Sequence, residues 1–340
     1  MLEKNNGEII LKNKSDIFLK EAKEIHLMPF KELDLYDKAF VEVESLIHRL
    51  TVGRNQENEI VFSSIKSALD NLLKTRDLSR HLSKKMKGYF THDAKNFRRA
   101  VIDMSKQIIL EDICEDYLKG KEFTEQDLEY LLERWVSVKK NWEAYRLIME
   151  DLFLRGENPA EVMVRNIDQE KDIGRLVKTL EWLLGGFDGG FHKSGPEYLN
   201  NKPEVIYNNI TAEEATNLKI KAPHGLIFNI LQNCLSNALR SDIKNMQDSR
   251  VQLIIERDGQ NLVFKFSDNG IGIPKEIQGR IFDEKFSTKE EALRGIEEGG
   301  KGLAYADKRL LKVGGNIEVM SPDTDGGWNT TFKITVPIVG

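Results

Sequence analysis

A proline-free stretch of about 60 residues, from Glu57 to Lys119, carries apolar residues at helical spacing and so limits the folds open to this chain. A single helix of this length would extend about 90 Å at 1.5 Å per residue, which is longer than the core of a globular monomer. The stripe therefore predicts a partner helix in a bundle or coiled coil. The apolar positions, which step mostly by three and four, are Ile65, Leu69, Leu72, Leu82, Met86, Phe90, Ala94, Phe97, Val101, Met104 and Ile108.

A break at Gly120 and a second apolar series indicate an antiparallel helical hairpin. Thr124 is followed three residues later by Asp127, in an arrangement like a capping box, which predicts the start of a helix. The apolar series then continues at helical spacing down to Arg155-Gly156. Two long helices with a tight turn form a hairpin, and two hairpins would make a dimeric four-helix bundle.

After Asn158-Pro159 the pattern changes to short alternating runs that predict strands, separated by helices. Tight turns such as Asp258-Gly259 join several of these strands, so we expect an α/β domain with mostly antiparallel pairing. The expected strands are 205–207, 218–220, 251–256, 262–267, 317–320 and 331–336, and the expected helices are about 160–184, 224–245 and 303–313.

The predicted fold class is therefore a multidomain chain with an α-helical hairpin, forming a dimeric four-helix bundle, followed by an α/β sandwich. We expect residues 1–55 to form an N-terminal arm or a small helical or sensory segment. Residues 56–157 are expected to form the hairpin, and residues 158–340 the α/β domain.

Composition and charge exclude several classes of protein. The net charge of −5 and the pI near 5.8 give no basic field, so nucleic acid is not an expected partner. Cys114 and Cys234 are too few for a disulfide framework and too isolated for a metal site. No apolar stretch reaches the ~18 residues needed to span a bilayer, and the first residues do not open a signal peptide. We expect a cytoplasmic chain with no membrane span.

Two amides and a basic residue mark the predicted helix at 224–245. Asn233 and Asn237 lie four residues apart and therefore share one helix face. Followed by Arg240, these amides could hold a hydrated Mg²⁺ and phosphate oxygens. The plain alternative is two solvent-facing amides.

The segment Asp268-Asn269-Gly270-Ile271-Gly272 follows directly on a predicted strand. A carboxylate at a strand end can accept a hydrogen bond from an exocyclic amine, and glycines let the backbone approach a flat ring closely. A plain turn is the alternative for this string alone.

Two further segments suggest a phosphate contact. Phe282 and Phe286 are spaced to anchor a mobile loop onto a core, and the polar tail of the same run, to Lys289, could meet phosphate. The run from Gly299 to Gly302 opens a predicted helix, where free N–H groups and the positive end of the dipole attract anions. The run is neither a Walker A loop nor a dinucleotide fingerprint.

In this order and spacing, the four segments resemble the N, G1, F and G2 boxes of histidine-kinase ATPase domains of the Bergerat (GHKL) type. The resemblance covers about residues 160–340 and implies an ATP-binding domain with ATP and Mg²⁺ as cofactors. It implies that Asn237 binds Mg²⁺ with Asn233 beside it, and that Asp268 accepts from the adenine amino group. The residues it places around the base and the triphosphate, under a lid at about 275–302, are Gly270, Gly272, Gly300, Gly302 and Thr330.

The first long helix carries a histidine whose neighbouring residues also resemble a histidine-kinase motif. His92 lies 28 residues before Gly120 and is followed by Asp93 and Asn96, which resembles the H box of a dimerisation and phosphotransfer domain. The resemblance implies that His92 attacks the γ-phosphate while Asp93 holds its second ring nitrogen, and that Asn96 positions a water or a phosphoryl group. Many H boxes have proline five residues after the histidine; here Phe97 stands there, so we expect no kink.

The combined resemblance implies a two-component sensor histidine kinase. Such a homodimer autophosphorylates His92 from ATP and passes the phosphoryl group to an aspartate in the receiver domain of a response regulator. One alternative is a histidine phosphotransfer or scaffold protein with an inactive nucleotide domain, which should have lost Asn237, Asp268 or the glycines. The other is a GHKL-type serine protein kinase, which needs no histidine on a dimer helix.

Overall fold

The computed structural model describes the chain in several ranges, which together include the helical hairpin and most of the α/β domain. Two expected site residues, Lys289 and Gly300, lie outside them, and so does most of the expected lid. The described residues are 33–34, 37–48, 50, 63–64, 67, 92–116, 119–154, 172–185, 203–240, 248–283, 286, 302–323 and 327–339.

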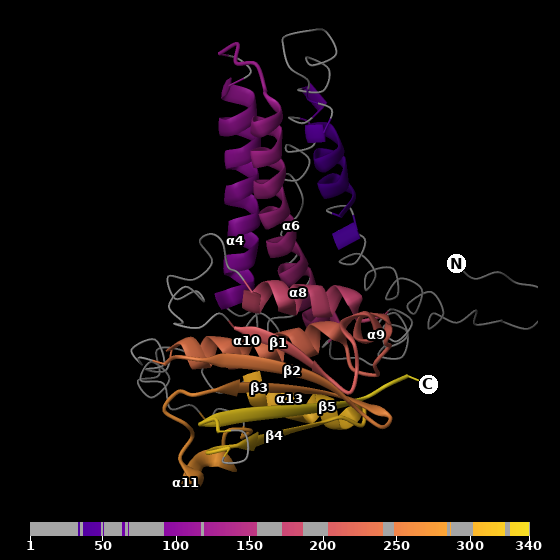
Figure 1. The fold of residues 1–340 in the computed structure, drawn as a ribbon, viewed down its shortest axis with the longest axis vertical. Helices are drawn as coiled ribbons and strands as arrows, with labels where there is room; N and C mark the ends of the chain where they lie inside the picture. The colour runs from indigo at the N-terminus through magenta and orange to yellow at the C-terminus, as the bar shows by residue number, and fades with distance from the viewer. Residues whose placement is uncertain are drawn as a thin grey trace, which may run out of the picture.

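Two antiparallel helices form the upper part of the molecule (Figure 1). The first comprises α4 (His92–Lys106) and a π-helical continuation, η2 (Gln107–Glu115), and it packs against α6 (Glu125–Leu154). Only three residues between 57 and 91 are described, so the full length predicted for the first helix lies outside the described part. The two helices lie antiparallel to one another, whereas the predicted dimerisation hairpin stays a prediction.

The start of α6 confirms the capping box. The Asp127 backbone N–H donates to Thr124 Oγ1 at 3.2 Å, and the Thr124 backbone N–H donates to Asp127 Oδ2 at 2.9 Å. These bonds satisfy two backbone donors that the helix itself leaves unpaired. The Thr124 hydroxyl also donates to Asp127 Oδ2 at 2.6 Å, and this bond, together with the one from the Thr124 backbone N–H, holds the pKa of Asp127 down, at about 2.

A third helical segment, residues 37–48, packs along α6 beside the hairpin (Figure 1). Trp135 and Trp142 lie two turns apart on α6 and therefore share a face. The Phe40 ring lies 5.5 Å from Trp135 and 5.4 Å from Trp142, and the Trp135 indole N–H donates to the Phe40 carbonyl. Residues 37–48 of the same chain thus cover part of the apolar surface of the hairpin.

The α/β domain contains one five-stranded sheet in the order β1-β2-β3-β5-β4. The β1 and β2 strands are parallel and the other pairs are antiparallel, which confirms the mostly antiparallel sheet. The strands are β1 (Glu204–Asn208), β2 (Val251–Asp258), β3 (Asn261–Asp268), β4 (Asn316–Met320) and β5 (Thr330–Pro337).

The prediction of a strand at 218–220 is wrong. Leu218 caps the short helix α9 (Ala212–Asn217), and Pro223 directly precedes the next helix. Too few extended residues remain between these helices for a strand, so Ile220 forms only an isolated bridge to Ile338.

Helices cover one face of the sheet. α8 (Gly174–Gly185), α10 (His224–Arg240) and α13 (Gly302–Lys312) contact β1, β3 and β4 respectively. Phe264 and Phe266 point to this covered face, whereas Lys265 between them pairs with Glu256 at 2.7 Å on the other face. α10 also packs against α6, so it joins the sheet to the hairpin (Figure 1). In the described part of the chain, no helix is both long and apolar enough to cross a membrane.

Candidate functional site

Asp268 and Thr330 lie side by side on the helix-covered face of the sheet. Asp268 ends β3 and, by the alternation of side chains along a strand, points to the same face as Phe264 and Phe266. Thr330 stands directly opposite it in the antiparallel register with β5 and therefore shares that face. The two residues are only 7% and 4% exposed. Both were expected near a base, and the fold brings them together.

The pKa of the Asp268 carboxyl is raised but still lies below neutral pH. Burial raises its pKa to about 6, and the Gly270 N–H, which donates to Oδ1 at 2.9 Å, opposes that rise. At neutral pH the group is therefore an ionised acceptor. Because Oδ1 is turned toward Gly270, Oδ2 is the oxygen best placed to accept from the amine of a ligand.

Asn329 holds the loop that follows Asp268. Its backbone N–H donates to the Asp268 carbonyl at 3.1 Å, and its side-chain amide donates to the carbonyls of Asn269 at 3.1 Å and Gly270 at 2.6 Å. The sequence patterns singled out its neighbour Thr330 but not Asn329 itself. Its role in the site depends on β5 pairing with β3.

Ser321 holds the same loop from the other side. Its hydroxyl accepts from the Ile273 N–H at 2.7 Å and donates to the Asn329 carbonyl at 2.6 Å. Gly272 has a φ of +75° here, and a Cβ on it would lie 3.1 Å from Ser321 Oγ and 3.3 Å from the Asn329 carbonyl oxygen. Glycine is therefore required at this position both for its backbone conformation and for space. No pattern in the sequence connected Ser321 with this loop.

The predicted amides form part of a longer row along α10. Asn229, Asn233 and Asn237 are four residues apart, and the Asn233 amide nitrogen donates to the Asn229 carbonyl at 2.7 Å and side-chain oxygen at 3.1 Å. With its nitrogen engaged, Asn233 has its side-chain oxygen as the atom that could ligate a cation. Asn237 is exposed on the same side. Amide oxygens are ligands that Mg²⁺ accepts, so this donor set fits the ion.

The asparagine row and the Asp268 loop are near one another. Cys234, next to Asn233, is buried; this burial, and to a lesser degree the Asp268 charge, raises the pKa of its thiol. α10 also contacts α13, whose first residue is Gly302. Described parts of three of the four predicted segments therefore meet around α10, which ends at Arg240.

The expected phosphoacceptor lies on the helix that touches α10. His92, Asp93 and Asn96 belong to the first two turns of α4. Phe97 follows them, is fully buried, and lies with its ring centroid 6.3 Å from that of Phe228 on α10. The α-helix continues through Phe97 to Lys106, as expected for a helix without proline.

Comparisons with known proteins identify the ATPase part of the chain. Residues 224–340 match the family described as histidine kinase-, DNA gyrase B-, and HSP90-like ATPase. The sensor histidine kinase RcsC of Escherichia coli K12 is 31% identical over 260 residues, which cover 71% of this chain. The signal transduction histidine-protein kinase ArlS of Staphylococcus aureus USA300 is 30% identical over 180 residues, or 48% of this chain.

These matches involve only part of each relative. The matched regions are 26% of RcsC and 38% of ArlS, so the chain spans well under half the length of either. Among solved structures, a mycobacterial sensor histidine kinase, MprB, matches at 20% identity and a TM-score of 0.32, over 42% of this chain and 84% of that one.

Proposed function

The chain belongs to the sensor histidine kinases, and we propose that it autophosphorylates His92 from ATP and passes the phosphoryl group to an aspartate of a response regulator. In this proposal the protein works as a cytoplasmic homodimer, with the hairpin as the dimerisation element. The receiver domain of the response regulator would dock near His92.

The contact between Phe97 and Phe228 is the observation that carries the proposal. It joins the helix of the expected phosphoacceptor to the helix that carries Asn233 and Asn237. His92 precedes Phe97 by five residues, which is about 7.5 Å along a helix axis. The end of α4 that bears His92 is therefore the end that meets the ATPase domain.

The site residues have distinct proposed roles in nucleotide binding. Asp268 accepts from the adenine amine, beside Thr330 on the same face. Asn233 and Asn237 would hold Mg²⁺, which when bound neutralises charge on the phosphates. The proposed backbone and basic contacts to the base and the phosphates are Gly270, Gly272, Arg240, Lys289, Gly300 and Gly302.

In the proposed transfer, one ring nitrogen of His92 attacks the γ-phosphorus. The bond from that phosphorus to the bridging oxygen breaks, and ADP leaves. Asp93 accepts a hydrogen bond from the other ring nitrogen and so stabilises the imidazolium that develops. Asn96, one turn further along the helix, would position a water or the transferred group.

The test is incubation with γ-phosphate-labelled ATP and Mg²⁺. We expect acid-labile, alkali-stable label on the wild type and on the control His48→Gln, which changes an exposed histidine of the 37–48 helix. His92→Gln should bind ATP without becoming labelled, and Asp268→Asn should lose ATP binding. Label that survives His92→Gln would favour the serine-kinase alternative, and absence of ATP binding by the wild type would favour the scaffold.

A further inference from the structure

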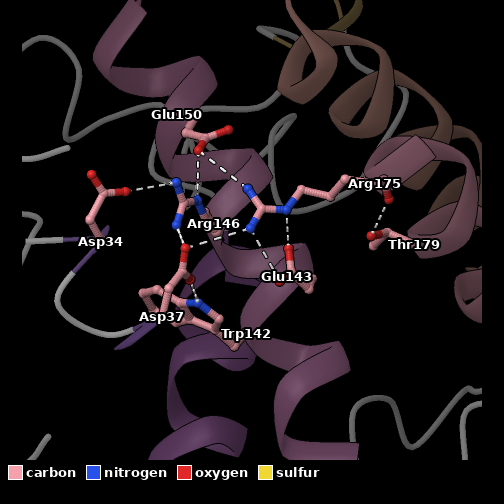
Figure 2. Close-up of polar contacts among 8 residues, drawn as sticks. All are labelled: Asp34, Asp37, Trp142, Glu143, Arg146, Glu150, Arg175 and Thr179. Atoms are coloured by element: carbon pink, nitrogen blue, oxygen red, sulfur yellow. Dashed lines mark hydrogen bonds and ion pairs between the residues drawn. The ribbon is translucent and has the colours of Figure 1, made fainter. Parts of the chain in front are cut away.

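Six charged side chains meet where α6 and α8 converge with residues 33–34 and 37–48, which we call the N-terminal segment (Figure 2). We call this cluster the charge junction. Two members come from the N-terminal segment, three from α6 and one from α8, and they are Asp34, Asp37, Glu143, Arg146, Glu150 and Arg175.

The centre of the charge junction is Arg146, whose side chain is only 7% exposed. Its Nε donates to Glu150 Oε1 at 2.7 Å, one turn further along α6. Its Nη2 donates to Asp34 at 3.0 Å, and its Nη1 pairs with Asp37. A buried guanidinium needs such partners, so the N-terminal segment supplies charge that the interior of α6 requires.

Arg175 brings the ATPase domain into the charge junction. Its guanidinium pairs with Glu143, including a bond from Nη2 to Oε1 at 3.2 Å, and it lies 3.7 Å from Glu150 Oε1. Its Nη2 also lies 3.7 Å from Asp37 Oδ2. The junction therefore connects α8 both to the hairpin and to the N-terminal segment.

Asp37 belongs to the N-terminal segment and contacts both α6 and α8. Its Oδ2 faces Arg146 and Arg175, and its Oδ1 accepts from the Trp142 indole N–H at 2.6 Å (Figure 2). Asp34, by contrast, contacts Arg146 and has a side chain that is 61% exposed. Of these two carboxylates, Asp37 is the one that reaches α8.

α8 is hydrogen-bonded to the sheet and packs against it, so a shift of α8 would move the ATPase domain. The Tyr207 hydroxyl on β1 donates to Glu181 on α8 at 2.5 Å. α8 also packs against α9, α10 and β1. α8, which carries Arg175, is thus in direct contact with the helix that carries Asn233 and Asn237.

We propose that Asp37 is a positioning residue for phosphoryl transfer, through which the N-terminal helix sets the place of the ATPase domain on the hairpin. The proposal rests on the proposed kinase function. Displacing the N-terminal helix removes Asp37 from Arg175 and leaves α6 as the one part of the charge junction that still pairs with Arg175. The rate of transfer to His92 then changes, while the pocket around Asp268 stays intact and ATP affinity does not.

The test uses Asp37→Asn in the full chain. The asparagine keeps an oxygen for the Trp142 N–H and removes the charge that faces the two arginines. Asp34→Asn is the matched control, because it makes the same change on the same segment without a contact to α8. Asp37→Glu restores the charge, and Arg175→Gln breaks the link from its other end.

We expect Asp37→Asn to change the autophosphorylation rate at saturating ATP at least threefold and to speed hydrogen exchange in α8 peptides. Its dissociation constant for ATP should stay within twofold of the wild type, as should every measurement on Asp34→Asn. Asp37→Glu should recover at least half of the change. Combining Asp37→Asn with Arg175→Gln should add nothing beyond Arg175→Gln alone.

Several results would overturn the proposal. One is an unchanged autophosphorylation rate together with unchanged hydrogen exchange in α8 of Asp37→Asn. Another is additive effects of the two substitutions in the double variant. A third is weaker ATP binding by Asp37→Asn, which would indicate general structural damage. If Asp37→Asn does not fold, Arg175→Gln tests the same link by the same measurements. A wild type that binds no ATP would refute the kinase function, yet α8 exchange would still report whether Asp37 positions the domain.

Discussion

Replacing Gly272 with alanine tests whether this position requires glycine both for its backbone conformation and for the space around it. The residue has a φ of +75°, and a Cβ on it would lie 3.1 Å from Ser321 Oγ. Gly259→Ala is the matched control, because Gly259 has a φ of +58° and nothing within 4 Å of its Cβ position. Gly259 lies in the turn before Asn261, the first residue of β3, and Asn261 is about 24 Å from Asp268 at 3.4 Å per residue.

The expected cost follows from these contacts. The left-handed backbone costs alanine about 1–2 kcal/mol in either variant. In Gly272→Ala, Ser321 must also move away from the added methyl group, which weakens its bonds to the Ile273 N–H and the Asn329 carbonyl. At about 0.5–1.5 kcal/mol for each bond, this adds about 1–3 kcal/mol. The smaller entropy of unfolded alanine is common to both variants and cancels in the comparison.

Hydrogen exchange of the β3 and β5 amides measures the opening free energy of the α/β domain in the full chain. We expect Gly272→Ala to lower it by about 1–3 kcal/mol more than Gly259→Ala. ATP affinity should fall at least tenfold in Gly272→Ala, because the displaced loop lines the proposed base site, and should be unchanged in Gly259→Ala. Equal destabilisation of the two variants together with unchanged ATP affinity would show that Gly272 is not needed for the space beside Ser321.

Two further predictions concern titrating groups. Because burial raises the pKa of Asp268 to about 6 from 3.8, the folded apoprotein binds this proton more tightly than the unfolded chain, and the group's contribution to stability is lost as pH rises between these values. Carboxyl ¹³C NMR, with Asp268→Asn for assignment, should give a midpoint near pH 6; a midpoint near 4 would contradict the buried setting. The pKa of Asp127 is lowered to about 2 by its bonds to Thr124, so its contribution to stability is present above about pH 4 and is lost as pH falls toward 2. Thr124→Ala should cost about 1 kcal/mol and speed hydrogen exchange in the first turn of α6, and unchanged exchange there would show that the cap contributes nothing.

Elements governed by neighbouring residues were predictable from the sequence. The capping box at Thr124 and Asp127, the turn at Asp258-Gly259 and the helix carrying Asn233 depend on interactions within a few residues. Turn chemistry and side-chain periodicity encode such interactions directly. The order and spacing of the ATPase segments belong to the same class of information, which is why they indicated the family.

Other parts of the fold were not predictable, because they depend on packing. Residues 37–48 lie against α6, although their sequence showed only a mixed polar and apolar pattern. The expected strand at 218–220 failed because the two flanking helices left too little extended chain. Local periodicity carries no information on what an element packs against.

The kinds of groups in the site can be read along the chain: a carboxylate at a strand end, amides four apart on a helix and a histidine on another helix. Which of these groups meet depends on how the chain folds. Sheet register sets Thr330 opposite Asp268, the last hairpin brings Ser321 to Gly272, and helix packing places Asp37 beside Arg175. These pairs are distant in the chain, so their contacts arise from strand register and helix docking, which depend on the whole fold rather than on any short segment.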